Sequence, residues 1–180
     1  MYYLFLAEGF EEVEALTPLD YLRRADIEVR SVGVTGEYVT GAHGITVRCD
    51  RRIDEIQADD TLEGVILPGG MPGVKNLEAN EKLLDLLHFA AQNKKLIGAI
   101  CAAPSIPGKL GLLEGRRAVC YPGFETYLAG AFTSQEKVVT DENFVTSRGA
   151  GTANLFAFSL IAYIKGEKAA EKIAQSVIYR

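Results

Sequence analysis

Cys101 stands where a nucleophile is expected, at the junction of a predicted strand and a predicted helix. The apolar run Leu96–Ile100 ends at this residue, and a helix is expected to begin at once, with Pro104 in its first turn, where a missing N–H costs nothing. Ala99 and Ala103, two positions to either side, are small, as a tight strand-to-helix turn requires. A sulfur there faces unpaired N–H groups and the positive end of the helix dipole, which both lower a thiol pKa. The sequence predicts a reactive thiolate; the alternative is a cysteine packed as a small apolar side chain.

A glycine pair supplies candidate backbone donors for the same site. Pro68-Gly69-Gly70 follows the predicted strand Gly64–Leu67, and paired glycines let the backbone approach a ligand closely. Their N–H groups, with that of Ala102, are candidates for an oxyanion hole. The alternative interpretation is a plain turn.

Three carboxylates open the first predicted helix, Glu11–Arg24. Acids in a first turn complement the helix dipole, which accounts for Glu11 and Glu12. Glu14 stands between apolar neighbours and is expected either to face inward or to lie on the surface. A buried carboxyl has a raised pKa and can act as a general acid or base. Pro18 is expected to interrupt this helix and start a second segment.

The other cysteines and the two histidines are weaker candidates. Cys49 and Cys120 lack the turn context and are expected to be structural, and the wide spacing of three cysteines fits neither disulfides nor a zinc site. His88, on a predicted helix, is expected to be structural. His43 lies on an irregular segment from which it is able to approach a pocket. No metal or organic cofactor is implied.

A second glycine-rich turn follows the strand that ends near Ser147. Thr152 and the start of the following helix are able to bind an anion. The alternative is structural: Gly149 and Gly151 allow a tight turn, and Thr152 is the N-cap.

The positions of these motifs follow from an alternation of short apolar runs and longer helical patterns. Continuous apolar strands alternating with helices predict a single α/β domain over residues 1–180, with a mostly parallel sheet and helices on both faces. The carboxyl ends of parallel strands meet at one edge of the sheet, so the acidic segment, the glycine pair and the cysteine are expected to converge there. Ile45–Cys49 is expected to be an edge hairpin strand. The predicted strands are Tyr2–Leu6, Val29–Val34, Val65–Leu67 and Leu96–Ile100, and the predicted helices are Glu11–Arg24, Ala79–Asn93, Pro104–Leu110, Ala153–Lys165 and Lys168–Ile178.

Composition limits the classes of partner. The chain has 180 residues, 48% of them apolar, and a formal charge of −5, and it carries no basic stripe. Nucleic acid and anionic membrane partners are therefore not expected, and a small molecule is. The N-terminal segment lacks the pattern of a signal peptide, and no apolar run is long enough to span a bilayer, so a soluble, cytoplasmic protein is expected.

Taken together, these motifs resemble the ThiJ/PfpI superfamily, specifically its DJ-one branch. The resemblance covers essentially the whole chain and implies a flavodoxin-like three-layer sandwich, a homodimer, and an elbow cysteine that oxidises readily to the sulfinic acid. The segments that carry it are Glu11-Glu12-Val13-Glu14, Pro18-Leu19-Asp20 with Arg23-Arg24, Leu67-Pro68-Gly69-Gly70, Ala99-Ile100-Cys101-Ala102-Ala103-Pro104, and Thr146-Ser147-Arg148-Gly149 with Gly151-Thr152.

By motif position, the resemblance implies roles for several residues. Cys101 is similar to the elbow cysteine of the family, and Glu14 to the carboxylic acid that hydrogen-bonds its sulfur; Gly69, Gly70 and Ala102 match the backbone donors. Asp20 matches an aspartate discussed as the third member of a triad.

The chain also departs from the family pattern. Tyr121 stands where many members of the branch have a histidine, and is an accessory candidate. Ala102 stands where the protease-like branch has a histidine, so peptidase activity is not expected.

The resemblance implies two alternative functions. The first is an enzyme that uses a Cys101–Glu14 dyad on small reactive carbonyls such as methylglyoxal, with a glyoxalase or deglycase outcome. The second is a non-enzymatic redox sensor whose cysteine oxidises to a sulfinate held by protonated Glu14.

Overall fold

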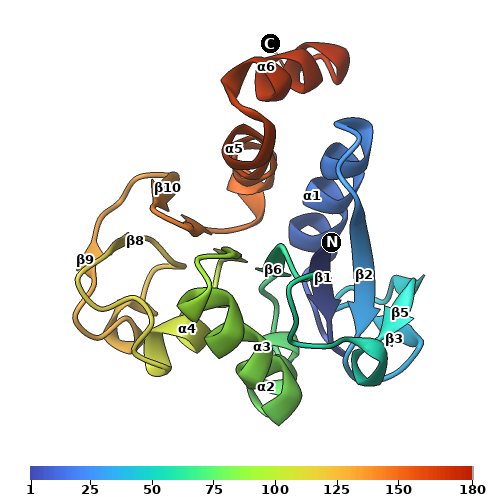
Figure 1. The fold of residues 1–180 in the computed structure, drawn as a ribbon, viewed down its shortest axis with the longest axis vertical. Coiled ribbons are helices and arrows are strands. Elements are labelled where there is room, and N and C mark those ends of the chain that lie inside the picture. Colours follow the sequence, from blue (N-terminus) through green and yellow to red (C-terminus); the bar gives the residue numbers. More distant parts are fainter. Residues whose placement is uncertain (180) are drawn as a thin grey trace.

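A seven-stranded sheet forms the centre of the molecule in the computed structural model, which describes residues 1–179 (Figure 1). Its strand order is β10-β11-β7-β6-β1-β2-β5; β10 runs antiparallel to β11, and the other pairs are parallel. The strands of this sheet are β1 (Tyr2–Leu6), β2 (Val29–Gly33), β5 (Arg51–Arg52), β6 (Gly64–Leu67), β7 (Leu96–Ile100), β10 (Val138–Asp141) and β11 (Phe144–Ser147). The predicted α/β fold with a mostly parallel sheet is confirmed.

Helices cover both faces of the sheet. In Figure 1, α1, α5 and α6 lie together, apart from α2, α3 and α4; the contacts of α5 with α1 and α6, and of α3 with β6 and β7, agree with this division. The helices are α1 (Glu12–Arg24), α2 (Gly73–Glu78), α3 (Glu81–Gln92), α4 (Ser105–Lys109), α5 (Ala153–Lys165) and α6 (Glu167–Ser176). Short 3-10 helices lie at Ile53–Glu55, Glu125–Tyr127 and Ala150–Thr152.

Two apolar clusters fill the spaces between the three layers. Strand β1 packs into both clusters, which explains why its sequence is continuously apolar. Successive side chains of a strand point to opposite faces. Leu4 and Leu6 belong to one cluster, whereas Phe5 and Ala7 belong to the other, and all four are fully buried. A strand buried on both faces needs no polar alternation.

The structure corrects the prediction that Pro18 interrupts the first helix. α1 is continuous through Pro18. A proline lacks the N–H that would bond the carbonyl four residues earlier, here that of Glu14, but burial of Ala15, Leu19 and Leu22 holds the helix in place against the core.

Three further features of the secondary structure differ from the sequence prediction or add to it. The predicted edge strand is β4 (Thr46–Arg48), which pairs with β3 (Tyr38–Thr40) in a hairpin separate from the central sheet. The predicted helix Ala79–Asn93 is confirmed as α3, but α2 precedes it. A second small sheet pairs β8 (Arg117–Ala118) with β9 (Phe132–Thr133).

Among residues 1–179, no helix combines the length and the apolar character needed to cross a membrane.

Candidate active site

Cys101 occupies a strained turn directly after β7. Its φ is 65°, in the left-handed region, which costs a residue with a side chain on the order of 1–3 kcal/mol. Two backbone hydrogen bonds hold the turn: the Cys101 N–H donates to the Ser147 carbonyl oxygen at 2.9 Å, and its carbonyl oxygen accepts from the Tyr121 N–H at 2.7 Å. These two hydrogen bonds could not be predicted, because the sequence does not show which residues lie beside the end of β7. The cysteine is the one thiol of the three that is partly exposed.

Glu14 lies against this cysteine. Its side chain is 1% exposed and is hydrogen-bonded to the Cys101 thiol. The carboxylate oxygen Oε2 also accepts a hydrogen bond from the Gly69 N–H at 2.8 Å. The inward orientation of Glu14, one of the two alternatives left by the sequence, is the observed one.

The two glycines have different tasks. A Cβ at Gly69 would lie 2.5 Å from Glu14 Oε2 and 2.6 Å from the Cys101 Cβ, so only glycine lets the carboxyl and the cysteine approach each other here. Gly70 has a φ of 91°, and its N–H, with that of Ala102, is hydrogen-bonded to the Cys101 sulfur. The candidate oxyanion donors are therefore Gly70 and Ala102, whereas the Gly69 N–H is occupied by Glu14.

The electrostatics of the pair reverse the expectation of a lowered cysteine pKa. Burial raises the pKa of Glu14 to about 7, against the lowering effect of its bonds to the thiol and to Gly69. Burial, and then the Glu14 charge, raise the pKa of Cys101 to about 12, and the two N–H bonds offset this only in part. The helix dipole is small, because α4 begins only at Ser105 and has five residues.

The ionisation of Glu14 and that of Cys101 are coupled. While Glu14 is ionised, its charge keeps the proton on the thiol. When the proton moves to the carboxyl, that charge disappears and the sulfur keeps its N–H donors, so each group's ionisation depends on the other. A carboxyl with a pKa near neutrality is suited to accept and return a proton.

The remaining thiols lie in the core. Cys49 and Cys120 are both buried, and burial raises the pKa of Cys49 to about 11 and that of Cys120 to about 12. Neither occupies a strained backbone position within residues 1–179. Their surroundings suit structural thiols.

Asp20 and Tyr121, whose roles the family resemblance implied, do not place their side chains against the Cys101 sulfur as Glu14 does. Asp20 lies on the exposed side of α1, where it forms an ion pair with Arg24 at 2.7 Å. The structure therefore does not make it a third member of the Cys101–Glu14 site. Tyr121 is tied to Cys101 through its backbone N–H, while its half-exposed ring packs edge-on against Phe124.

The histidines are also separate from the sulfur. His43 is largely exposed and its Nδ1 lies 2.9 Å from Glu12 Oε2 and 3.6 Å from Glu11 Oε2; the hydrogen bond with Glu12 raises the pKa of His43. His88 lies on α3, among the helices of the opposite face. Glu14 is therefore the titratable side chain that the structure places against the sulfur.

One cluster has the composition of a metal site. Glu11, Glu12 and His43 each offer a ligand atom, and these atoms lie within 4.8 Å of one another. Glu12 Oε1 already accepts the His43 backbone N–H at 2.8 Å, so hydrogen bonds and ion pairing account for the arrangement without a metal.

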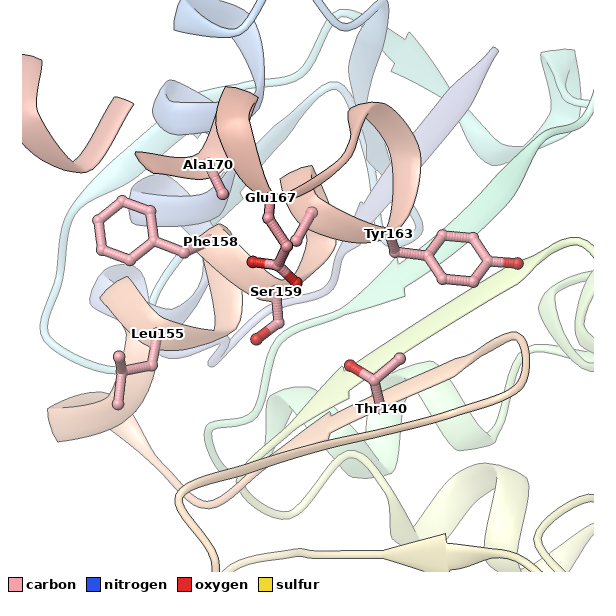
Figure 2. Close-up of a pocket in the computed structure, with 8 residues that line it drawn as sticks. Thr140, Leu155, Phe158, Ser159, Tyr163, Glu167 and Ala170 are labelled. Carbon is pink, nitrogen blue, oxygen red and sulfur yellow. The ribbon is translucent and has the colours of Figure 1, made fainter. Parts of the chain in front are cut away.

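A separate cavity lies away from this chemistry. Between α5, α6 and β10 is a hollow of about 270 Å³ whose lining includes Ser159, Tyr163 and Glu167 (Figure 2). Neither Cys101 nor Glu14 lines it, so we do not place the active site there.

A three-layer α/β sandwich with a cysteine on a strained turn, paired with a buried carboxyl, defines a class of cysteine-elbow proteins. The chain belongs to the DJ-1/PfpI family, whose pattern matches residues 2–163. The predicted ThiJ/PfpI resemblance is thus confirmed.

Relatives and solved structures agree with this assignment. Protein dj-1beta of Drosophila melanogaster is 33% identical over 178 residues, which cover 97% of this chain and 95% of that protein. Deglycase PfpI of Pyrococcus furiosus is 32% identical over 151 residues, covering 82% and 90%. The structure of oxidized DJ-1 from Toxoplasma gondii superposes with a TM-score of 0.93 at 33% identity and covers 98% of this chain and 97% of its own.

The close approach at Gly69 generates a first prediction. Gly69→Ala should displace Glu14 from the sulfur and reduce the chemical reactivity of Cys101 about tenfold or more, because the new methyl group would overlap both side chains. Gly111→Ala is the control: Gly111 has a φ of 73° but no atom within 4 Å of the added Cβ, so it should lose about 1 kcal/mol of stability and keep its reactivity. Equal reactivity in the two variants would contradict this role of Gly69.

Burial of Glu14 generates a second prediction, on stability. Folding raises the pKa of Glu14 from 4.5 to about 7, so between these values the folded state holds a proton that the unfolded chain has lost. The free energy of unfolding therefore falls as pH rises through this window. Glu14→Gln removes that fall, and the variant should gain on the order of 2–3 kcal/mol relative to the wild type between pH ~4.5 and ~8. Urea unfolding of both proteins measures the difference; a difference independent of pH would contradict a buried, titrating carboxyl.

Proposed function

We propose that the protein is an enzyme that acts on small reactive carbonyls through Cys101 and Glu14, without an organic cofactor. The observation that supports this most directly is the position of Glu14, a fully buried carboxyl that meets the Cys101 side chain at Gly69 and whose pKa burial raises to about 7. Such a pair can hand a proton from sulfur to a substrate oxygen at neutral pH.

The first step would be addition of the thiol to an aldehyde. The Cys101 sulfur bonds to the aldehyde carbon and the π electrons of the carbonyl move to its oxygen. Glu14 takes the thiol proton and returns it to that oxygen, and the N–H groups of Gly70 and Ala102 stabilise the developing negative charge. The product is a hemithioacetal, formed with no net gain or loss of protons.

With methylglyoxal, the same carboxyl would complete the reaction. Glu14 removes the hydrogen from the former aldehyde carbon to give an enediol, and a proton returns to the neighbouring carbon. The resulting thioester of lactate is hydrolysed by water, which frees the thiol, so methylglyoxal and water become lactate and a proton. Release of a carbonyl adduct from an amine or thiol would be the deglycase outcome. The names of two relatives, deglycases of Pyrococcus furiosus and Pyrococcus abyssi, support this class of substrate.

The redox-sensor hypothesis has one observation in its favour. One solved relative is the oxidized DJ-1 of Toxoplasma gondii, and Cys101 is the partly exposed thiol of this chain. Against it, a raised thiol pKa leaves little thiolate to attack peroxide. Proton transfer to Glu14 during bond formation favours the carbonyl reaction. The homodimer implied by the family resemblance, like the cytoplasmic location, stays a prediction.

Turnover of methylglyoxal in a matched set of variants tests the proposal. Cys101→Ser should abolish lactate formation, and Glu14→Gln should lower kcat/KM about 10²- to 10⁴-fold because the proton acceptor is lost. In the wild type, kcat/KM should rise with pH through about 7, where Glu14 ionises. Cys120→Ala, which removes a buried thiol elsewhere, is the control and should keep the activity.

Two results would contradict the proposal. Full activity in Cys101→Ser would exclude both the carbonyl enzyme and the redox sensor. Peroxide-dependent sulfinate formation at Cys101 in a wild type without any aldehyde turnover would favour the sensor.

A further inference from the structure

A hollow includes the second glycine-rich turn, which follows the strand that lies beside β7. Its volume is about 450 Å³, and it is lined by Tyr121, Pro122, Lys137, Arg148 and the turn 149–152. β11 lies beside β7 with Ser147 opposite Ile100, so the residues that follow these strands, Arg148 and Cys101, leave the same edge of the sheet side by side. Cys101 is bonded through its backbone to Tyr121, which lines the hollow, and to Ser147, the residue before the lining residue Arg148.

The charge of the hollow contrasts with that of the chain. The protein has a formal charge of −5, yet the residues lining the hollow include two cations, Lys137 and Arg148, and no carboxylate. The acids nearest in sequence are engaged elsewhere: Glu136 accepts from the Ser134 hydroxyl, and Glu125 accepts from the Gly123 N–H. A local positive region on an acidic protein attracts anions to that place.

Arg148 has unused donor capacity. Its Nε is buried and is the one buried side-chain nitrogen or oxygen without a hydrogen-bond partner within residues 1–179. Its Nη1 makes only a long bond of 3.4 Å to the Gln135 carbonyl oxygen. The guanidinium edge that includes Nε matches a carboxylate in a two-point contact, so Arg148, which lines the hollow, has the donors that a carboxylate bound there would need.

We propose that Arg148, assisted by Lys137, forms a subsite for the carboxylate of an anionic carbonyl substrate whose aldehyde carbon is attacked by Cys101. This inference rests on the proposed function for the identity of the reacting group. The substrate class is a 2-oxoaldehyde with a carboxylate at its far end, of which 4,5-dioxopentanoate is an example. The glycine-rich turn then contributes room for the anion, and Tyr121 forms the opposite wall.

Alkylation of Cys101 by two reagents of the same reactive group tests the subsite without relying on turnover. Iodoacetate carries a carboxylate, and iodoacetamide is its neutral counterpart. In both, the sulfur bonds to the methylene carbon, iodide leaves, and the thiol proton passes to Glu14 or to water. We expect the iodoacetate-to-iodoacetamide rate ratio at Cys101 to exceed that of glutathione in the same buffer by about tenfold. A ratio at or below that of glutathione would overturn the subsite, since that is what the Glu14 charge alone would produce.

Variants of Arg148 and Lys137 test whether these two cations cause the preference for iodoacetate. Arg148→Gln should return the ratio to the glutathione value, Arg148→Lys should keep part of it, and Lys137→Gln should lower it about two- to threefold. Lys172→Gln, an equal charge change at an exposed position of α6, is the control and should leave the ratio unchanged. Because both reagents react with the same sulfur, the iodoacetamide rate of each variant corrects for any disturbance of the fold. An unchanged ratio in Arg148→Gln would overturn the assignment.

A substrate pair then tests the carbonyl itself. 4,5-Dioxopentanoate should have a higher kcat/KM than methylglyoxal, and Arg148→Gln should lower the ratio of the two kcat/KM values about tenfold. Turnover of methylglyoxal with no preference for the anionic aldehyde would overturn the substrate class and leave the proposed function intact. Failure with both aldehydes would count against the proposed function, whereas the alkylation ratio would still decide whether the anion subsite exists.

Discussion

The burial of a carboxyl group against a thiol is the constraint on which the rest of this site depends. Neither Glu14 nor Cys101 can ionise without affecting the other, because Glu14 is fully buried against the partly exposed Cys101 thiol. Charges in such surroundings interact far more strongly than on a surface. The outcome is a carboxyl whose pKa is raised to about 7 beside a thiol whose pKa is raised by the carboxylate charge.

The fold creates this pair by bringing three chain segments to one edge of a parallel sheet. Glu14 comes from the first turn of α1, after β1; Gly69 and Gly70 follow β6; Cys101 follows β7. These three strands are neighbours in the order β7-β6-β1, so their carboxyl ends are adjacent and the site needs no long loop. The next strand, β11, adds Ser147 as a backbone support for the elbow and Arg148 as a cation beside it.

Much of this arrangement could be predicted from the sequence, and the failures have physical causes. Continuous apolar runs identified the buried strands, and the small residues around Cys101 identified the elbow. The direction of the cysteine pKa could not be predicted, because it depends on how closely a carboxylate from another element approaches the sulfur. The role of Gly69, whose lack of a side chain lets Glu14 approach Cys101, could not be predicted for the same reason. Asp20 was assigned by family resemblance, although an acid four residues before Arg24 also fits an exposed helix ion pair.

The most direct measurement is the pH dependence of Cys101 alkylation by iodoacetamide, followed by mass spectrometry, in the wild type and in Glu14→Gln. If the two groups share a proton, the wild-type rate should rise in a step near pH 7, where Glu14 becomes able to accept the thiol proton, and this step should be absent from the variant. Identical pH profiles in the two proteins would show that Cys101 reacts independently of Glu14 and would contradict the account.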